Sequence, residues 1–286
     1  MVGSAFDNAP IGIAVLTPPG IVVLCNAAMG ALLGRSPSDL VGAPIFSLTH
    51  LDDRAVARRP CEFLPSDGTR VARLECQFVR RDGTAVWVAV NTARVPEAVG
   101  HPAHLIMHAE DITERKAFEA TLTHRALHDA LTGLPNRVLL AERITHACVG
   151  RGRHSRPSCL FYVDLDGFKA VNDRFGHTAG DRVLQQLAER FAALLRPQDT
   201  AARLGGDEFA VLCVDMEPQH GAQVAERLRA AAAEPFVING QTISVTAAVG
   251  ISTSEIVDPT APDASAMLHE ADRAMYEQKQ QRARDT

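Results

Sequence analysis

The stretch that decides the fold of the C-terminal half is Ala201-Ala202-Arg203-Leu204-Gly205-Gly206-Asp207-Glu208-Phe209-Ala210-Val211-Leu212-Cys213-Val214. Two apolar runs flank a pair of glycines, so the pattern predicts a β-hairpin that carries Asp207 and Glu208 at its tip. Glycine adopts positive φ at little cost, which lets a backbone approach a bulky anion. An acidic pair on a turn is otherwise simply solvated, and the hairpin alone does not decide between these two interpretations.

A second acidic segment ends a buried strand upstream of the hairpin. Cys159–Asp164 is predicted to be that strand, and Asp164-Leu165-Asp166 follows its apolar residues. Such a strand delivers carboxylates to the carboxyl edge of a sheet, where open α/β sheets place their ligands. Carboxylates converging from two strands make a hard-oxygen site suited to Mg²⁺, which prefers one or two carboxylates plus substrate phosphates.

Two further segments, 168–173 and 176–181, carry residues suited to a nucleotide. Lys169 beside a metal-bound triphosphate would neutralise charge on the non-bridging oxygens. Asn172 and Asp181 suit a guanine, because a carboxylate accepts from both N1–H and N2–H, whereas adenine presents an unprotonated N1 there. The alternative is that Asp181 only caps the helix that follows it.

The remaining C-terminal sequence alternates helical and strand patterns. The predicted helices are Arg137–Val149, Asp181–Leu195, Ala222–Ala233 and Ala264–Lys279, with a second hairpin around Asn239-Gly240. Strands that alternate with helices predict an α/β layer with helices on the faces of one central sheet.

The N-terminal half shows a different pattern, of short strands and short helices between turn signals. The predicted strands are Ile11–Leu16 paired with Ile21–Cys25, Leu74–Arg80 paired with Ala85–Arg94 across Asp82-Gly83, and Leu105–His108. This order predicts an α+β sandwich with one covered sheet.

A helix from Thr113 to His128 is predicted between the two halves, because Thr113 is a good cap and no Gly or Pro follows. Phe118, Leu122 and Arg125 or Ala126 form a thin apolar stripe. Such a stripe fits either a short two-stranded coiled coil or a helix that packs on one of the domains.

Composition excludes several classes of protein. A chain of 286 residues with 46% hydrophobic and 22% charged residues suits two globular domains, and a net charge of −5 argues against nucleic acid as a general partner. No run approaches the roughly 18 apolar residues of a membrane helix and no export signal is visible, so we expect a cytoplasmic protein without membrane insertion. The six cysteines are scattered, so we expect reduced core residues.

The N-terminal half resembles a PAS sensor domain over essentially its whole length. The residues that carry this resemblance are, in order, Phe6–Ile13, Leu32–Gly42, Arg80–Thr84 and Asp111–Arg115. The histidines His50, His101, His104 and His108 suggest haem, but His50 lies in a stretch that resembles a common PAS loop. Cys25-Asn26-Ala27 is not the context of a flavin-reactive cysteine. The default is a pocket that is empty or holds a small ligand, used chiefly for dimerisation.

The C-terminal half resembles the GGDEF-domain diguanylate cyclases, which have a nucleotide-cyclase-like fold. The carrying motifs are Asp129–Arg137, Asp164–Asp173, Gly176–Asp181, Arg203–Phe209 and Ala271–Tyr276. The resemblance implies condensation of two GTP molecules into cyclic di-GMP with release of pyrophosphate. It also implies three parts: a PAS sensor domain at 1–112, a signalling helix at 113–128 and a GGDEF domain at 129–286.

The resemblance assigns roles residue by residue. It implies Mg²⁺, or Mn²⁺ in its place, on Asp164, the backbone carbonyl of Leu165, and Asp207, while Glu208 assists the metal or removes the sugar hydroxyl proton. Substrate would contact Phe168, Lys169, Asn172, Asp181, Gly205, Gly206 and Lys279. Asp166 has no assigned role. The family commonly has Gly-Arg-Asn after the final lysine, whereas this chain has Gln280-Gln281-Arg282-Ala283-Arg284, which leaves the phosphate role of Arg282 or Arg284 open.

The resemblance further implies a homodimer and inhibition by the product. Arg196 and Asp199 stand at the spacing from Gly205 at which the family carries its inhibitory site, although such a pair at a helix end is also a common way to neutralise a helix terminus. The sequence does not locate the partner arginine of that site. Two rival functions remain: a degenerate GGDEF domain that only binds GTP or cyclic di-GMP, and a relaxed cyclase that also accepts ATP. No phosphodiesterase domain is expected, because the chain ends shortly after Lys279.

Overall fold

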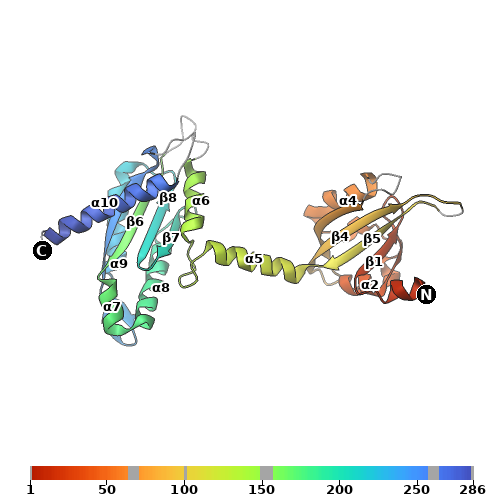
Figure 1. Cartoon of the computed structure of the whole chain (residues 1–286), viewed down its shortest axis with the longest axis horizontal. Coiled ribbons are helices and arrows are strands. Elements are labelled where there is room, and N and C mark those ends of the chain that lie inside the picture. The colour runs from red at the N-terminus through yellow and green to blue at the C-terminus, as the bar shows by residue number, and fades with distance from the viewer. Residues whose placement is uncertain (1, 64–70, 100–101, 149–156, 257–263, 285–286) are drawn as a thin grey trace. The chain divides into compact units, whose positions relative to one another are not determined.

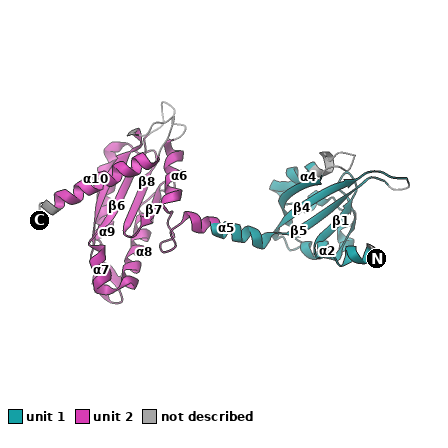
Figure 2. Ribbon diagram, in the orientation of Figure 1, with its two compact units in different colours: residues 1–122 teal, residues 123–286 magenta. Residues whose placement is uncertain are grey.

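The computed structural model describes residues 2–63, 71–99, 102–148, 157–256 and 264–284. The chain divides into two compact units, Met1–Leu122 and Thr123–Thr286 (Figures 1 and 2). Each unit has its own sheet and its own buried core.

The first unit is built on a five-stranded antiparallel sheet in the order β2-β1-β5-β4-β3. Its strands are β1 (Gly12–Leu16), β2 (Val22–Cys25), β3 (Val71–Val79), β4 (Ala85–Val95) and β5 (His104–Asp111). The two predicted pairings are confirmed, since β1 pairs with β2 and β3 pairs with β4. The β3–β4 turn forms at Asp82-Gly83 because Gly83 takes φ 86°, a conformation that favours glycine.

Short helices accompany this sheet: α1 (Val2–Asp7), α2 (Ala27–Leu33), α3 (Pro37–Leu40), α4 (Arg54–Phe63) and the 3₁₀ turns η1 (Ile45–Leu48) and η2 (Leu51–Asp53). Asn26 anchors α1 and α2 to β1. Its buried amide oxygen accepts from Ile13 N and Met29 N, both 2.9 Å away, and its amide nitrogen donates to the carbonyls of Phe6 and Ile11.

The core of the first unit leaves one small apolar cavity of about 10 Å³, which is room for about one water molecule. Cys76, Phe78, Val90 and Met107 line it together with the buried Thr49 and Thr92. His50, His104 and His108 do not line this cavity, and His101 lies outside the described residues.

The helix α5 (Thr113–Leu127) begins where β5 ends. Its first turn is fixed to the sheet, because Thr113 Oγ1 accepts from Trp87 N at 3.1 Å and both Arg115 and Lys116 pair with Glu75 at 2.6 Å. None of its side chains is buried; Phe118 is 63% and Leu122 49% exposed. Packing on the first unit therefore stops at the first turn, and the apolar stripe stays exposed, as a coiled coil requires.

The second unit contains a four-stranded sheet in the order β11-β6-β8-β7. Its strands are β6 (Cys159–Asp166), β7 (Thr200–Gly205), β8 (Glu208–Cys213) and β11 (Thr246–Thr253), and every pairing is antiparallel. The carboxyl-edge argument applies to parallel sheets, so it does not hold for this sheet. An antiparallel neighbour brings the start of β8, and with it the β7–β8 turn, beside the end of β6.

Helices cover both faces of this sheet, as predicted (Figure 1). The helices α6 (Arg137–Cys148) and α10 (Ala264–Arg284) pack on one face, and α7 (Phe168–Phe175), α8 (His177–Ala193) and α9 (Gly221–Ala233) on the other. Side chains along β6 point alternately to the two faces. Leu160 and Tyr162 pack in the core under α6 and α10, and Phe161 and Val163 pack in the core under α7, α8 and α9. The predicted hairpin at Asn239-Gly240 is formed by β9 (Phe236–Ile238) and β10 (Gln241–Ile243).

Three elements differ from the prediction. Helix α8 begins at His177 after Gly176, which takes φ 84°, so Asp181 lies inside the helix and does not cap it. The short helix α7 and the strand β11 were not anticipated. Five cysteines, Cys25, Cys76, Cys148, Cys159 and Cys213, are buried and free, as expected, while the side chain of Cys61 lies outside the described residues. Among the described helices, none has the length and apolar character to cross a bilayer.

Candidate nucleotide and metal site

Three of the predicted metal and phosphate residues, Asp164, Asp207 and Lys279, meet at the end of β6. Asp164 is paired with Glu208 across the β6–β8 ladder, which brings the hairpin tip with Asp207 alongside. From α10, Lys279 Nζ reaches Asp164 Oδ1 at 2.5 Å and Asp166 Oδ1 at 4.0 Å. Residues from three distant segments thus form one cluster of carboxylates around a single ammonium group.

The electrostatics of this cluster favour a cation. Burial raises the pKa of Asp207 above its ordinary value, and the Asp164 carboxylate raises it further, against the opposing effects of Lys279 and Arg203. A raised pKa means that the ionised form is costly in this environment, and a bound cation would relieve that cost.

The donor set also fits Mg²⁺. Asp164 and Asp207 supply two carboxylates, and one or two carboxylates together with substrate phosphates are the usual arrangement for Mg²⁺. The Leu165 side chain is buried on the opposite face, so only its main chain is available as a ligand.

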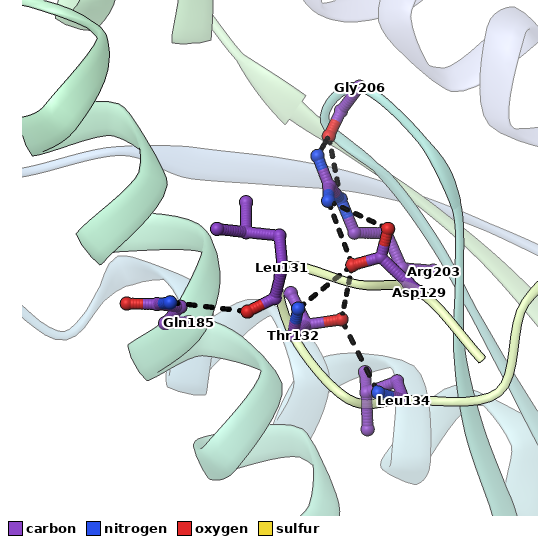
Figure 3. A network of polar contacts seen from close by, with 7 residues as sticks. All are labelled: Asp129, Leu131, Thr132, Leu134, Gln185, Arg203 and Gly206. Atoms are coloured by element: carbon purple, nitrogen blue, oxygen red, sulfur yellow. Dashed lines mark hydrogen bonds and ion pairs between the residues drawn. The ribbon is translucent and has the colours of Figure 1, made fainter. Parts of the chain in front are cut away.

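The hairpin tip is held by Arg203, as Figure 3 shows. Gly205 and Gly206 take φ of 144° and 52°, so the turn depends on their lack of side chains. Arg203 Nε and Nη2 donate to the carbonyl of Gly206 at 3.0 and 2.7 Å, and Nη1 donates to both carboxylate oxygens of Asp129 at 2.9 and 3.0 Å.

Asp129 is in turn fixed within its own loop. Its Oδ1 accepts from the main-chain N and the hydroxyl of Thr132 at 2.9 and 2.7 Å. Burial alone would raise the pKa of Asp129, but the hydrogen bonds from Arg203 and Thr132 outweigh it and hold the pKa below its ordinary value. The sequence interpretation gave Arg203 and Asp129 no role. The Asp-x-x-Thr turn signal marked the loop but not its distant partner.

The end of α5 is connected to the same arginine. Asn136 donates from its side chain to the Ala126 carbonyl at 2.6 Å and from its main chain to the Leu127 carbonyl at 2.9 Å. The adjacent Pro135 forms an isolated bridge with His128 and accepts from Arg203 N at 3.0 Å. The last turn of α5 therefore has a continuous hydrogen-bonded route to β7.

The predicted base-reading residues lie together on α7 and α8. A Cβ at Gly180 would stand 1.9 Å from Asn172 Oδ1 and 3.1 Å from Phe168 Cζ, so the bare glycine lets the Asn172 amide pack against the first turn of α8. Asp181 follows Gly180 and is exposed. Phe168 is buried, so its main chain is the part available to a phosphate, and Lys169 is exposed. Within the described part of the chain, no hydrogen bond or ion pair joins Lys169, Asn172 or Asp181 to the carboxylate cluster.

Glu208 lies on the face covered by α6 and α10. Its Oε2 is 3.8 Å from Arg137 Nη2, the first residue of α6. Burial, together with Glu208, raises the pKa of the neighbouring Tyr162 to about 12, against a hydrogen bond with Arg137. Arg137 is thus a second arginine near the site to which the sequence interpretation gave no role.

Helix α10 reaches the carboxylate cluster because it packs closely on β11 at Gly250, which has no side chain. A Cβ at Gly250 would stand 2.0 Å from the Ala271 carbonyl oxygen and 2.3 Å from Met275 N. One turn beyond Met275, Gln278 Oε1 accepts from Val249 N at 3.0 Å. These contacts fix the depth at which Lys279 meets Asp164.

Arg282, one of the two arginines whose phosphate role the sequence left undecided, lies near the end of α10. Arg282 Nη1 lies 3.5 Å from Asp166 Oδ2 and donates to the Ala247 carbonyl at 3.2 Å. Thr246 Oγ1 donates to the same Asp166 oxygen at 2.7 Å. Asp166 therefore links β6 to β11 and α10, and Arg282 stands beside Lys279. The side chain of Arg284 lies outside the described residues.

The predicted inhibitory pair lies in a separate region. Arg196 and Asp199 line a cavity of about 60 Å³ together with Cys213 and Arg227. The Asp199 carboxylate accepts from Arg196 N at 3.1 Å and Val214 N at 3.2 Å, so it shapes the loop before β7. Arg227 on α9, whose Nη2 donates to the Leu194 carbonyl at 3.1 Å, is an arginine beside this pair that the sequence alone did not reveal.

Two known families match the chain. The family described as "Diguanylate cyclase, GGDEF domain" matches residues 126–285, and the PAS fold matches residues 6–117. The chain belongs to the GGDEF family. Its N-terminal half matches the PAS fold, as the sequence predicted.

Two relatives illustrate matches to the C-terminal half alone and to both halves. The diguanylate cyclase TpbB of Pseudomonas aeruginosa is 40% identical over 164 residues, which cover 57% of this chain and 37% of the relative. An uncharacterized signaling protein of Caulobacter vibrioides is 32% identical over 274 residues, 93% of this chain and 32% of that one. The chain thus spans about a third of the length of these relatives.

A solved GGDEF domain shares the architecture. The structure of the GGDEF domain of TpbB, also called YfiN, from Pseudomonas aeruginosa matches with a TM-score of 0.50 and 39% identity. The match covers 54% of this chain and 89% of that one.

Proposed function

We propose that this chain is a diguanylate cyclase that condenses two GTP molecules into cyclic di-GMP and releases pyrophosphate. The observation that carries this proposal is the meeting of Asp164, Asp207 and Lys279 at the end of β6 in a GGDEF domain. Two carboxylates and a lysine suit a metal-bound triphosphate.

Asp164, Asp207 and the main-chain carbonyl of Leu165 would hold Mg²⁺, with Mn²⁺ as a substitute. When bound, the ion supplies charge neutralisation on the phosphates and lowers the pKa of the attacking hydroxyl. The raised pKa of Asp207 indicates that a cation beside this residue would stabilise its ionised form.

The chain's own residues would carry the remaining steps. Glu208 accepts the proton of the 3′-hydroxyl, the 3′-oxygen bonds to the α-phosphorus of the second GTP, and the bond from that phosphorus to pyrophosphate breaks. Lys169 and Lys279 neutralise the triphosphate, together with the main chain at Phe168 and the Gly205-Gly206 turn. Arg282 adds a second cation beside Lys279.

Asn172 and Asp181 would read the guanine. The Asp181 carboxylate accepts from guanine N1–H and N2–H, whereas adenine leaves it unpaired. Asn172 packs against Gly180, so its amide would present a fixed edge to the base.

Two catalytic domains, each with one GTP, would face each other across a two-fold axis. Holding the two GTP molecules in a reactive geometry replaces their chance encounter in solution. This lowers the activation free energy by up to about 7–11 kcal/mol in ideal cases. We propose residues 1–112 as the sensor, 113–128 as the signalling helix and 129–286 as the catalytic domain. The exposed Phe118 and Leu122 are candidates for the helix–helix contact.

Product inhibition would act at Arg196, Asp199 and Arg227. The arginine side chains suit the phosphates and guanine edges of cyclic di-GMP. Asp199 already accepts two main-chain hydrogen bonds, so in this proposal its main task is to hold the loop that presents Arg196.

The test is to incubate the purified chain with GTP and Mg²⁺ and to measure pyrophosphate and cyclic di-GMP by mass spectrometry. Both products are expected from the parent and neither from Asp207→Ala. Glu189→Gln, an exposed acid on α8, serves as the matched control and should keep parent activity. Binding of GTP without pyrophosphate release would instead identify the binding module described above.

A further inference from the structure

Arg137 and Tyr162 meet Glu208, the proposed base, from two other elements. Glu208 stands opposite Asp164 in the β6–β8 ladder, and Tyr162 precedes Asp164 by two residues. Residues two apart on a strand share a face, so Tyr162 and Glu208 are diagonal neighbours under α6 and α10, within reach of one long side chain. From α6, Arg137 Nη2 lies 3.8 Å from Glu208 Oε2, and the same guanidinium forms a hydrogen bond with the Tyr162 hydroxyl.

Tyr162 is the buried part of this arrangement, with 3% of its surface exposed. Its ladder partners are Ala210 on β8 and Gly250 on β11, and their small size leaves room for the ring under the two helices. A buried tyrosine hydroxyl needs a hydrogen-bonding partner, and Arg137 supplies it. The core therefore fixes the ring, and the ring fixes the guanidinium.

The main chain of Arg137 is fixed as well. Asn136 caps α6, because its Oδ1 accepts from Val138 N at 2.9 Å and from Leu139 N at 3.1 Å. Arg137 is the next residue and the first of the helix. An ion pair between exposed side chains usually contributes little, because both partners move freely, but here the arginine is held at both ends.

We propose that Arg137 is a positioning residue for Glu208: it holds one carboxylate oxygen and leaves the other available to the 3′-hydroxyl of GTP. This inference rests on the proposed function. Among the described residues no hydrogen bond or ion pair reaches Glu208 Oε1, whereas Oε2 faces the arginine. An unpaired glutamate samples several rotamers, and a general base acts only within hydrogen-bond reach of the proton that it takes. Arg137 therefore acts through Glu208 and not on the substrate.

The first test is kinetic. Arg137→Gln should lower kcat by roughly tenfold to a hundredfold, the loss that misplacement of a reacting group causes, and leave KM for GTP unchanged. Arg137→Lys keeps the charge but not the planar fork that also reaches Tyr162, so its kcat should lie between those of the parent and Arg137→Gln. The matched control is Arg143→Gln, on the same helix but bonded to Thr200, which should keep the parent kcat.

A double-mutant cycle shows whether Arg137 acts through Glu208. In the Glu208→Gln background, Arg137→Gln should lower kcat no further, because the group that it positions is already lost. Losses that multiply would overturn the proposal. A higher Mg²⁺ requirement with an unchanged kcat at saturating Mg²⁺ would also overturn it, since Arg137 would then support the metal site.

A measurement without turnover tests the contact itself. The chain has two tyrosines, so tyrosine labelled with ¹³C at Cζ gives two nuclear magnetic resonance signals, which Tyr162→Phe assigns. Tyr276, 59% exposed on α10, is the internal reference. Arg137→Gln should shift the Tyr162 signal alone, and Arg143→Gln should shift neither. An unmoved Tyr162 signal would overturn this inference even in an active enzyme, whereas a shifted signal in an inactive parent would count against the proposed function alone.

Discussion

Arg203 and Asp129 share two hydrogen bonds, of 2.9 and 3.0 Å, although they lie 74 residues apart in sequence. The same guanidinium holds the carbonyl of Gly206, so one side chain joins the start of the domain to the turn that presents Asp207. Both partners are largely shielded, with 11% and 22% of their side chains exposed, which makes the pair more sensitive to substitution than a surface ion pair.

Asp129→Asn should reduce kcat more than it raises KM, because the hairpin tip with Asp207 loses its fixed position while the phosphate contacts outside the tip and the base contacts remain. We expect a loss between roughly tenfold and a hundredfold, the range that small misplacements cause. Unfolding in urea should report a loss of about 2 kcal/mol, the scale of a hydrogen bond to a charged group. Arg143→Ala removes an arginine contact to Thr200 on the same strand, away from the turn, and is the matched control. An equal fall in kcat for both variants would contradict the positioning role.

The pH dependence of Mg²⁺ activation should follow Asp207. Because burial raises its pKa, Asp207 takes up a proton at a higher pH than an ordinary aspartate as the solution is acidified. The protonated carboxyl is a poor ligand, so the apparent Mg²⁺ affinity should fall within a pH range above the ordinary carboxylate value of 3.8. Lys279→Met removes a cation that lowers this pKa, so residual activity should fall off at a still higher pH. The measurement is a Mg²⁺ titration of pyrophosphate release at each pH, and identical profiles in both proteins would exclude Lys279 from the effect.

Gly180→Ala should weaken guanine recognition without unfolding the domain. The new methyl group would meet the Asn172 amide at 1.9 Å, so the amide must turn away from the base. The expected result is a higher KM for GTP. Asp181→Ser should instead relax the choice of base and give hybrid product from mixed GTP and ATP. Gly221→Ala, where the nearest atom is 3.5 Å away, is the control for adding a methyl group to a helix start. Unchanged KM in Gly180→Ala would show that Asn172 does not contact the base.

Inhibition by cyclic di-GMP should depend on both Arg196 and Arg227. Each alanine variant should retain GTP turnover and lose most of its sensitivity to added product, because the two arginines line one cavity. In the parent, inhibition should be non-competitive with GTP, since the cavity lies outside the carboxylate cluster. Arg229→Ala on the same helix is the control. Parent-like inhibition of Arg227→Ala would remove α9 from the product site.

Insertions after Leu122 should reveal whether α5 transmits rotation. Two added residues turn the helix by roughly 200° and four by a little more than one full turn, so the two-residue insertion should change activity far more. Neither should change GTP affinity, because the contacts to the nucleotide lie beyond Asp129. Steady-state assays and equilibrium GTP binding of the two variants provide the comparison, and equal activity in both would make the helix a tether.

The sequence predicted those parts of the site that rest on local signals. The glycine pair before Asp207 and the apolar run before Asp164 each indicate one turn or one strand, and both are present. The predicted start of α8 at Asp181 was wrong. Asp181 is a favourable capping residue, but α7 ends and α8 begins at Gly176. Partners such as Asp129 for Arg203 depend on tertiary packing, and no short-range pattern encodes them.

The proposed activity depends on the contact of Gly250 with α10, which the Gly205–Glu208 signature does not report. Any larger residue at this position would push Ala271 and Met275 outward and draw Lys279 away from Asp164. A homologue could keep every acidic residue of the hairpin and still be silent. Classifying such proteins as active or inactive from the Gly-Gly-Asp-Glu signature alone would misclassify this homologue. The residue at position 250 on β11 should therefore be considered together with the signature.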